Sequence, residues 1–216
     1  MADYKRIIPF ILKAEGGLSR ATTDSASKHP SPCSFNGLTG WHTNKGVTYQ
    51  AFVSLAPSLG YEASCTNFIT MPQNIWEKIF KIGYWDAVKG DAIKSQAVAD
   101  QLADMAWGAG AGAAALLMQK TLNRFYNKKL IEDGGIGQKT IDAINSIDAK
   151  DLFTKFTMQK ITWYNSLPGQ QANYAGWTNR INALTSELTD FIKNNPGKSG
   201  AGALALLALL YAASQN

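Results

Sequence analysis

Two carboxylates near the start of the chain have the spacing and setting for acid–base chemistry. Glu15 ends an apolar segment and is followed by two glycines in the stretch KAEGGLSRATTDS, and Asp24 comes nine positions later. Hydrolysis of a glycosidic bond uses such a pair, because one carboxylic acid protonates the leaving oxygen while a second group attacks the sugar or activates water. Glu–Gly–Gly is also an ordinary helix terminus, so this triplet alone leaves both interpretations open.

The position of Glu15 suits the acid of such a pair. Apolar neighbours at the end of a buried helix disfavour the charged form of a carboxyl group. The two glycines have no Cβ, so a polymer can approach the backbone closely. We therefore expect Glu15 to donate the proton. We expect Asp24 to stay ionised, to stabilise positive charge on the sugar and to orient water.

The elements that must hold these residues are almost all helices. Asp3 can cap a first helix that ends near Glu15, and a polar segment with two prolines and three glycines follows over 19–46. Residues 113–126 form an apolar helix that we expect at the buried centre. The pattern predicts a mainly α fold with room for a small β-hairpin within 19–48, and further helices over 47–56, 72–80, 95–107, 149–167 and 175–194.

Composition restricts the class of protein. The 216 residues are 45% hydrophobic and 17% charged, which is typical of a folded globular chain. The net charge is +5, but the basic residues are scattered without a block of like charges. We therefore expect no nucleic-acid partner, and either a polyanionic partner such as a cell wall or ordinary solubility. The first residues do not resemble a signal peptide, so we expect synthesis in the cytoplasm and a separate route to any target outside it.

Two further features leave alternatives open. Residues 203–213 form an uncharged apolar run, too short to cross a bilayer alone, which takes about 20 residues. They form either a last helix packed on the body or a tail that docks on a membrane or protein complex. The spacing of His29, Cys33, His42 and Cys65 fits no standard zinc site, so we expect no metal or other cofactor. The two cysteines then form a disulfide or stay as free thiols.

Longer stretches resemble a known family. The spacing of Glu15 and Asp24 is similar to that of the catalytic pair in phage-type lysozymes, in which a threonine completes the site. The chain as a whole, over residues 5–190, resembles glycoside hydrolase family 108, the N-acetylmuramidases often labelled secretion activator proteins. The resemblance is carried by ILKAEGG, TNKGVT, YWDAVKGD, DQLADMAWGAGAGAAALLMQKTL, DGGIGQKTIDAI and NYAGWTNRI.

This resemblance implies a fold, an activity and a division of the chain. It implies a lysozyme-like α fold that cuts the muramic acid–glucosamine linkage of peptidoglycan, without a cofactor. Glu15 matches the family's acid, Asp24 is the simplest match for the second group, and Thr43 is the threonine that holds water. Inversion is then expected, with carboxyl groups about 6.5–9.5 Å apart. The expected regions are 1–92 for catalysis, 93–195 for peptidoglycan binding, and 196–216 as a hinge and tail.

The chain also departs from the family. Residues 25–42 replace a shorter turn rich in aspartate and glycine, and Trp107 stands where the family tends to carry asparagine. We expect substrate contacts from Trp41, Asn44, Tyr49, Asp104 and Trp107. Asp104 can instead be a buried acid that holds the neighbouring loop. Trp85, Trp107 and Trp177 either stack on sugars or fill the core.

The insertion makes other functions worth testing. A chain that keeps the fold but has lost turnover would be a peptidoglycan-binding component of a phage, secretion or injection apparatus. A third alternative is a structural part of a membrane-associated machine, docked through residues 203–213.

Overall fold

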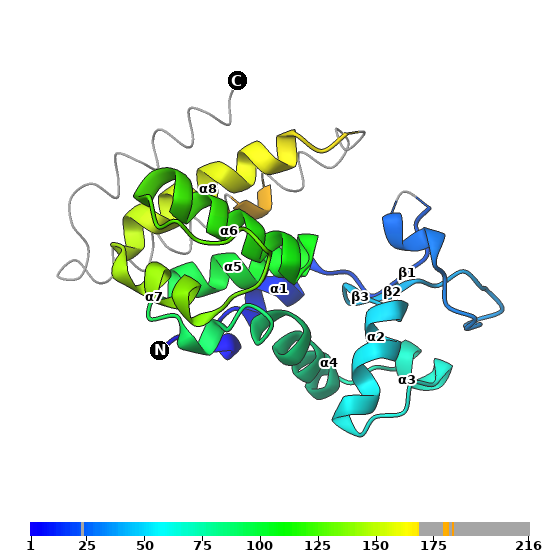
Figure 1. Cartoon of the computed structure of the whole chain (residues 1–216). Helices are drawn as coiled ribbons and strands as arrows, with labels where there is room; N and C mark the ends of the chain where they lie inside the picture. The colour runs from blue at the N-terminus through cyan, green and yellow to red at the C-terminus, as the bar shows by residue number, and fades with distance from the viewer. Residues whose placement is uncertain (23, 169–178, 182, 184–216) are drawn as a thin grey trace.

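The computed structural model describes residues 1–22, 24–168, 179–181 and 183. Helices dominate these residues, and one small sheet joins them (Figure 1). The α-helices are α1 (Ile8–Ala14), α2 (Tyr49–Leu55), α3 (Cys65–Ile69), α4 (Gln73–Phe80), α5 (Gln96–Ala109), α6 (Ala111–Tyr126), α7 (Gln138–Ser146) and α8 (Ala149–Asn165). The mainly α prediction is confirmed for the described part of the chain.

Short 3-10 and π segments link these helices. They are η1 (Tyr4–Arg6), η2 (Ser25–Lys28), η3 (Ala56–Leu59), η4 (Lys81–Trp85, a π turn that continues α4) and η5 (Gly90–Ala92). Asp3 caps η1 rather than one long first helix. Pro9 explains the break, because proline lacks the N–H that would continue the hydrogen-bond ladder from the preceding turn.

The predicted hairpin is present and belongs to a three-stranded antiparallel sheet. Strand β1 (Leu18–Ser19) pairs with β2 (Thr43–Asn44), and β2 pairs with β3 (Val47–Thr48). The register places Ser19 opposite Thr43, so the strand that follows Glu15 lies directly beside the strand that carries the predicted catalytic threonine.

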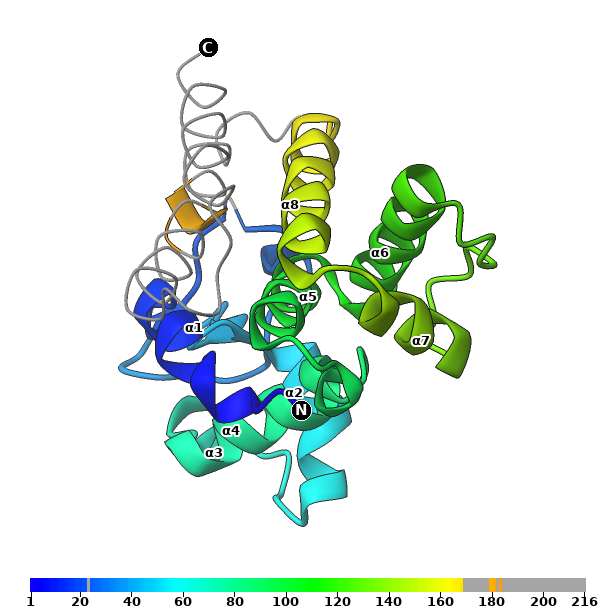
Figure 2. The same cartoon turned by 90° about the vertical axis from the view of Figure 1, so that its left-hand side faces the viewer.

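Helix α5 is the central element of the helical body. It packs against α6, α8, η4 and η5, and in both views it lies between α1 and α6 (Figures 1 and 2). Its small residues Ala99, Ala103 and Ala106 are fully buried, which lets the neighbouring helices approach closely. The expectation that residues 113–126 form the buried centre is therefore corrected. Helix α6 buries one face, whereas α5 is covered on several sides.

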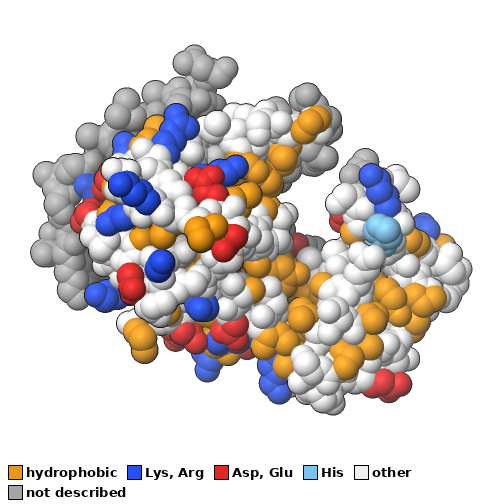
Figure 3. All heavy atoms as spheres, in the orientation of Figure 1, with side chains coloured by type: hydrophobic (Ala, Val, Ile, Leu, Met, Phe, Trp, Pro, Cys, Tyr) orange, Lys and Arg blue, Asp and Glu red, His pale blue; other side chains and the backbone are white. Residues whose placement is uncertain are grey.

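Strands β1–β3, helices α2 and α3, and residues 24–42 form a lobe beside this helical body (Figure 1). The inserted residues are tied down, because Cys33 and Cys65 form a disulfide that joins the insertion to the first residue of α3. Figure 3 shows the surface hollowed between this lobe and the helical body.

Several expectations fall on residues that the structure does not describe. They concern the apolar segment 203–213, the hinge that precedes it, Trp177 and most of the predicted helix 175–194. Within the described ranges, the helices are too short or too polar to cross a membrane.

Candidate active site

Glu15 lies where helix α1 gives way to the sheet. Its backbone is extended, with φ −95° and ψ 139°, and its N–H donates to the Leu12 carbonyl, which closes the last turn of α1. The side chain is 19% exposed, so it is neither sealed in the core nor freely solvated. No described atom lies within 4 Å of the positions that Cβ atoms would take at Gly16 and Gly17. The backbone after Glu15 is therefore open to approach.

The Glu15 carboxylate is held by polar partners. The indole N–H of Trp107 donates to Oε1 over 2.7 Å, and the Arg180 guanidinium lies 3.3 Å from the same oxygen. The expected apolar surroundings are thus only part of the environment. Burial raises the pKa of the neighbouring Tyr84, and the negative charge of Glu15 raises it further.

An aromatic cluster fixes the side chain of Trp107. Its ring lies 4.7 Å from that of Tyr84, 5.4 Å from that of Trp76 and 5.7 Å from that of Phe80, measured between centroids. These rings come from α4, η4 and α5, so the donor to Glu15 is held by packing across three elements. A donor fixed in this way can orient a catalytic carboxyl group without rearrangement during a reaction.

The turn between β2 and β3, which belongs to the lobe, packs against Glu15. Lys45 and Gly46 both have positive φ, as a two-residue hairpin turn of this type requires. Lys45 N–H donates to the Gly17 carbonyl, and the Trp76 indole donates to the Lys45 carbonyl. A Cβ on Gly46 would stand 2.5 Å from Glu15 Oε2, so only glycine fits here.

Asp24, His42 and Thr43 are brought together beside the sheet. The His42 ring is buried, with Nδ1 2.8 Å from the Thr43 hydroxyl and 3.8 Å from Asp24 Oδ2. His42 Nε2 lies 3.2 Å from the Ala21 carbonyl. A carbonyl oxygen only accepts, so Nε2 donates to it, and in the neutral ring Nδ1 accepts the Thr43 proton. Asp24 uses its other oxygen to cap η2.

The sequence prediction considers His42 only in a zinc site that the spacing of its ligands argues against, and it does not include the contact of His42 with Thr43. The available signal was its position directly before that threonine. Cys33 and Cys65 are bonded to each other, which resolves the alternative between a disulfide and free thiols.

Three residues that we expect to contact substrate have partners within the protein. The Asn44 side chain is buried and donates to the carbonyls of Phe68 and Ile69. Asp104 is buried and ion-paired, which fits the alternative of a structural acid. Tyr49 packs edge-on against Phe68.

Trp85, Trp107 and Trp41, the described tryptophans weighed as sugar contacts, have three different surroundings. Trp85 is fully buried and belongs to the core. Trp107 reaches Glu15, as described above. Trp41 is half-buried within the insertion, where its indole donates to the Leu38 carbonyl.

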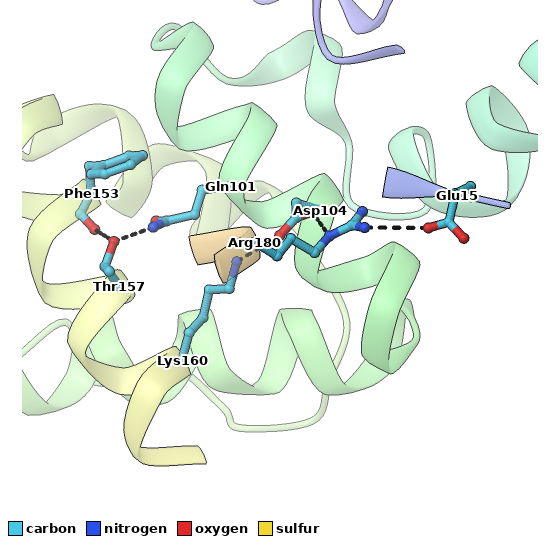
Figure 4. Close-up of polar contacts among 7 residues, drawn as sticks. All are labelled: Glu15, Gln101, Asp104, Phe153, Thr157, Lys160 and Arg180. Carbon is cyan, nitrogen blue, oxygen red and sulfur yellow. Dashed lines mark hydrogen bonds and ion pairs between the residues drawn. The ribbon is translucent and has the colours of Figure 1, made fainter. Parts of the chain in front are cut away.

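A line of alternating charges runs from Glu15 into the helical body (Figure 4). Arg180 pairs with Glu15 Oε1 through Nη1 and with Asp104 Oδ1 through Nε, and Lys160 pairs with Asp104 Oδ2. Burial works against the ionised form of Asp104, but the two cations outweigh it and hold the pKa of Asp104 below its usual value. Sequence analysis missed both cations, although Arg180 lies in the quoted stretch NYAGWTNRI.

Two family models match most of the chain. Residues 8–110 match the model described as Glycosyl hydrolase 108, and residues 113–182 match the model described as Predicted Peptidoglycan domain. The two matches meet beside Gly110, where α5 ends and α6 begins. No curated protein matches the chain.

One solved structure shares the fold. The structure of Brucella abortus SagA is similar over 87% of this chain and 94% of that one, with a TM-score of 0.68 and 22% sequence identity. The lysozyme-like, mainly α prediction is confirmed by this comparison.

Proposed function

Because residues 8–110 belong to the glycosyl hydrolase 108 family and residues 113–182 to the predicted peptidoglycan domain, we propose that this chain is an N-acetylmuramidase. It cleaves the β-1,4 bond between N-acetylmuramic acid and N-acetylglucosamine, and Glu15 is its acid. The observation that carries this proposal is the setting of Glu15, which is partly exposed, oriented by the Trp107 indole and followed by an open backbone.

The contacts of Glu15 indicate which oxygen carries the proton. Oε1 already accepts from Trp107 and faces the Arg180 guanidinium, so a proton is favoured on Oε2. Because Gly46 has no side chain, the hairpin turn lies close to that oxygen without a clash. Glu15 donates from Oε2 to the glycosidic oxygen as the bond to the muramic acid breaks.

The second half of the reaction uses the cluster of Asp24, His42 and Thr43. Since the Thr43 hydroxyl donates to His42 Nδ1, the lone pairs of its oxygen are free to accept from a water molecule. Asp24 starts ionised, accepts a hydrogen bond from that water and stabilises positive charge on the sugar. It takes one proton from the water as the water attacks, and solvent later returns a proton to Glu15. Attack by this water on the opposite face of the ring inverts the anomeric centre.

The expected substrate is the glycan strand of peptidoglycan, bound in the hollow between the lobe and the helical body (Figure 3). Trp41 lies in the inserted segment of that lobe and contributes an aromatic surface. Such an activity would serve an endolysin or a secretion or injection apparatus that must open the wall.

Product analysis tests this function. Purified peptidoglycan is digested with the chain, reduced with borohydride and analysed by mass spectrometry. A muramidase gives fragments that end in reduced N-acetylmuramic acid. Fragments ending in reduced N-acetylglucosamine would contradict the assigned bond. Binding to peptidoglycan without any fragments would instead identify a binding component that has lost turnover.

A further inference from the structure

Arg180 connects the two family regions at the proposed acid. It lies within the part of the chain that matches the peptidoglycan domain, whereas Glu15 and Asp104 lie within the glycosyl hydrolase 108 match. The guanidinium extends between the two carboxylates in Figure 4. Its Nε lies 2.6 Å from Asp104 Oδ1, and its Nη1 lies 3.3 Å from Glu15 Oε1.

Asp104 sets the position of this guanidinium. The contact with Asp104 is the shorter of the two, and Asp104 is 2% exposed and anchored by Lys160, which is 1% exposed. Arg180 Nη2 is buried and has no hydrogen-bond partner among the residues that the structure describes. Nε of Arg180 is therefore fixed in the interior by Asp104, and Nη1 is directed at Glu15.

The charges along this line balance only when Glu15 is ionised. Glu15 and Asp104 then supply two negative charges, and Arg180 and Lys160 supply two positive ones. Protonated Glu15 leaves a net positive charge in a partly dry environment, where unpaired charge is costly. Two tyrosines also lie beside these charges. Burial and Glu15 raise the pKa of Tyr84, burial and Asp104 raise the pKa of Tyr164, and the neutral form of each adds no compensating charge.

We propose that Arg180 is a positioning residue for the Glu15 acid, supplied by the peptidoglycan-domain region and held in place by Asp104. It rests on the proposed function. When Glu15 gives its proton to the leaving oxygen, a carboxylate forms next to a cation that is already in place. This lowers the cost of proton transfer, since the cation needs no rearrangement. Removal of this cation would favour the protonated form of Glu15, so the dependence of turnover on pH should change with it.

The pH profile of turnover tests this role. Kinetics on purified peptidoglycan are compared for wild type, Arg180→Gln, Arg180→Lys and the control Arg124→Gln, which removes an exposed arginine on α6. We expect Arg180→Gln to lower kcat by roughly 10- to 100-fold, the value of a hydrogen bond to a charged group. In Arg180→Gln, the alkaline limb of kcat plotted against pH should move to higher pH, because loss of the cation favours the protonated form of Glu15. Arg180→Lys should keep the wild-type limb, and Arg124→Gln should match wild type.

The outcomes separate this inference from the function on which it rests. An alkaline limb that stays in place in Arg180→Gln, with wild type active and Glu15→Gln inactive, overturns the role of Arg180 alone. An inactive wild type overturns the muramidase function and this role with it. If Arg180→Gln does not fold, Arg180→Met provides a second neutral side chain of similar length, with the same shift expected.

Discussion

Gly46 lies so close to Glu15 that a Cβ at position 46 would stand 2.5 Å from Oε2 and 2.6 Å from the Trp107 ring. The turn cannot retreat easily, because its backbone is hydrogen-bonded to Gly17 and to the Trp76 indole. The β2–β3 hairpin therefore limits the movement of the Glu15 carboxyl group on this side. The lobe and the helical body are coupled at the atom that we expect to carry the proton.

Gly46→Ala should damage turnover more than stability. The added methyl group must displace the Glu15 carboxyl group or the Trp107 ring, and a misplacement of about 1 Å can cost about 100-fold in rate. Positive φ adds a strain of about 1–2 kcal/mol. Gly60→Ala is the matched control, since Gly60 also has positive φ but no described atom within 4 Å of its added Cβ. Equal losses of kcat in the two variants would show that strain, not contact with Glu15, is responsible.

His42→Gln should lower kcat on peptidoglycan by roughly 10- to 100-fold with little change in KM. The loss of the ring removes the acceptor that orients the Thr43 hydroxyl, a bond whose absence leaves that hydroxyl free to turn. His29→Gln is the control, because His29 is an exposed histidine of the same insertion. Steady-state kinetics on soluble glycan fragments give both parameters. A His42→Gln variant with wild-type kcat would remove His42 and Thr43 from the proposed mechanism.

Asp104→Asn should destabilise the fold in a way that depends on pH. Lys160 and Arg180 outweigh burial and lower the pKa of Asp104, so its contribution is present above the unfolded value of about 3.9 and is lost as pH falls further. Breaking a buried pair typically costs about 3–5 kcal/mol. Urea unfolding should show this difference in free energy of unfolding between wild type and Asp104→Asn at pH 7, and a smaller difference near pH 3. Asp142→Asn, at an exposed aspartate, is the control. An equal difference in free energy of unfolding at both pH values would refute the stabilisation of the fold by ionised Asp104.

Loss of the disulfide should weaken the lobe. Cys33 and Cys65 are 32 positions apart, and closing a loop of that length in the unfolded chain is worth about 3–4 kcal/mol. Urea unfolding of Cys33→Ser and of wild type with a reducing agent should therefore give similar, lower midpoints. An unchanged midpoint in both samples would mean that the bond adds nothing to the stability of the insertion.

The sequence predicts the helices more completely than it predicts the contacts within the site. Hydrophobic period is a local signal, and it predicts the helices over 47–56 and 95–107. The structure has α2 and α5 there, starting at Tyr49 and Gln96 after the caps Thr48 and Ser95. The small hairpin expected within 19–48 lies at 43–48, where Lys45 and Gly46 adopt the positive φ of a tight hairpin turn. What spacing cannot predict is which distant side chain reaches Glu15. Arg180 is 165 positions away, and its ion pairs with Glu15 and with Asp104 of α5 form only in the tertiary structure.

The environment of Glu15 illustrates the same limit. An apolar helix end predicts an apolar setting, and Trp107 and its aromatic neighbours supply one wall of it. The polar partners come from other elements, and a single sequence does not reveal their direction. For Asn44 the pattern TNKGVT is informative about the family, but the buried amide binds backbone carbonyls rather than facing the hollow.

The most direct measurement compares Glu15→Gln with wild type for both hydrolysis and binding of purified peptidoglycan. Glutamine keeps the size of the side chain and an acceptor for the Trp107 indole, but it has no proton to donate to the glycosidic oxygen. We expect hydrolysis to fall by roughly 10²- to 10⁴-fold, the usual contribution of a general acid, while sedimentation with peptidoglycan stays unchanged. Wild-type hydrolysis by Glu15→Gln would show that another group protonates the leaving oxygen.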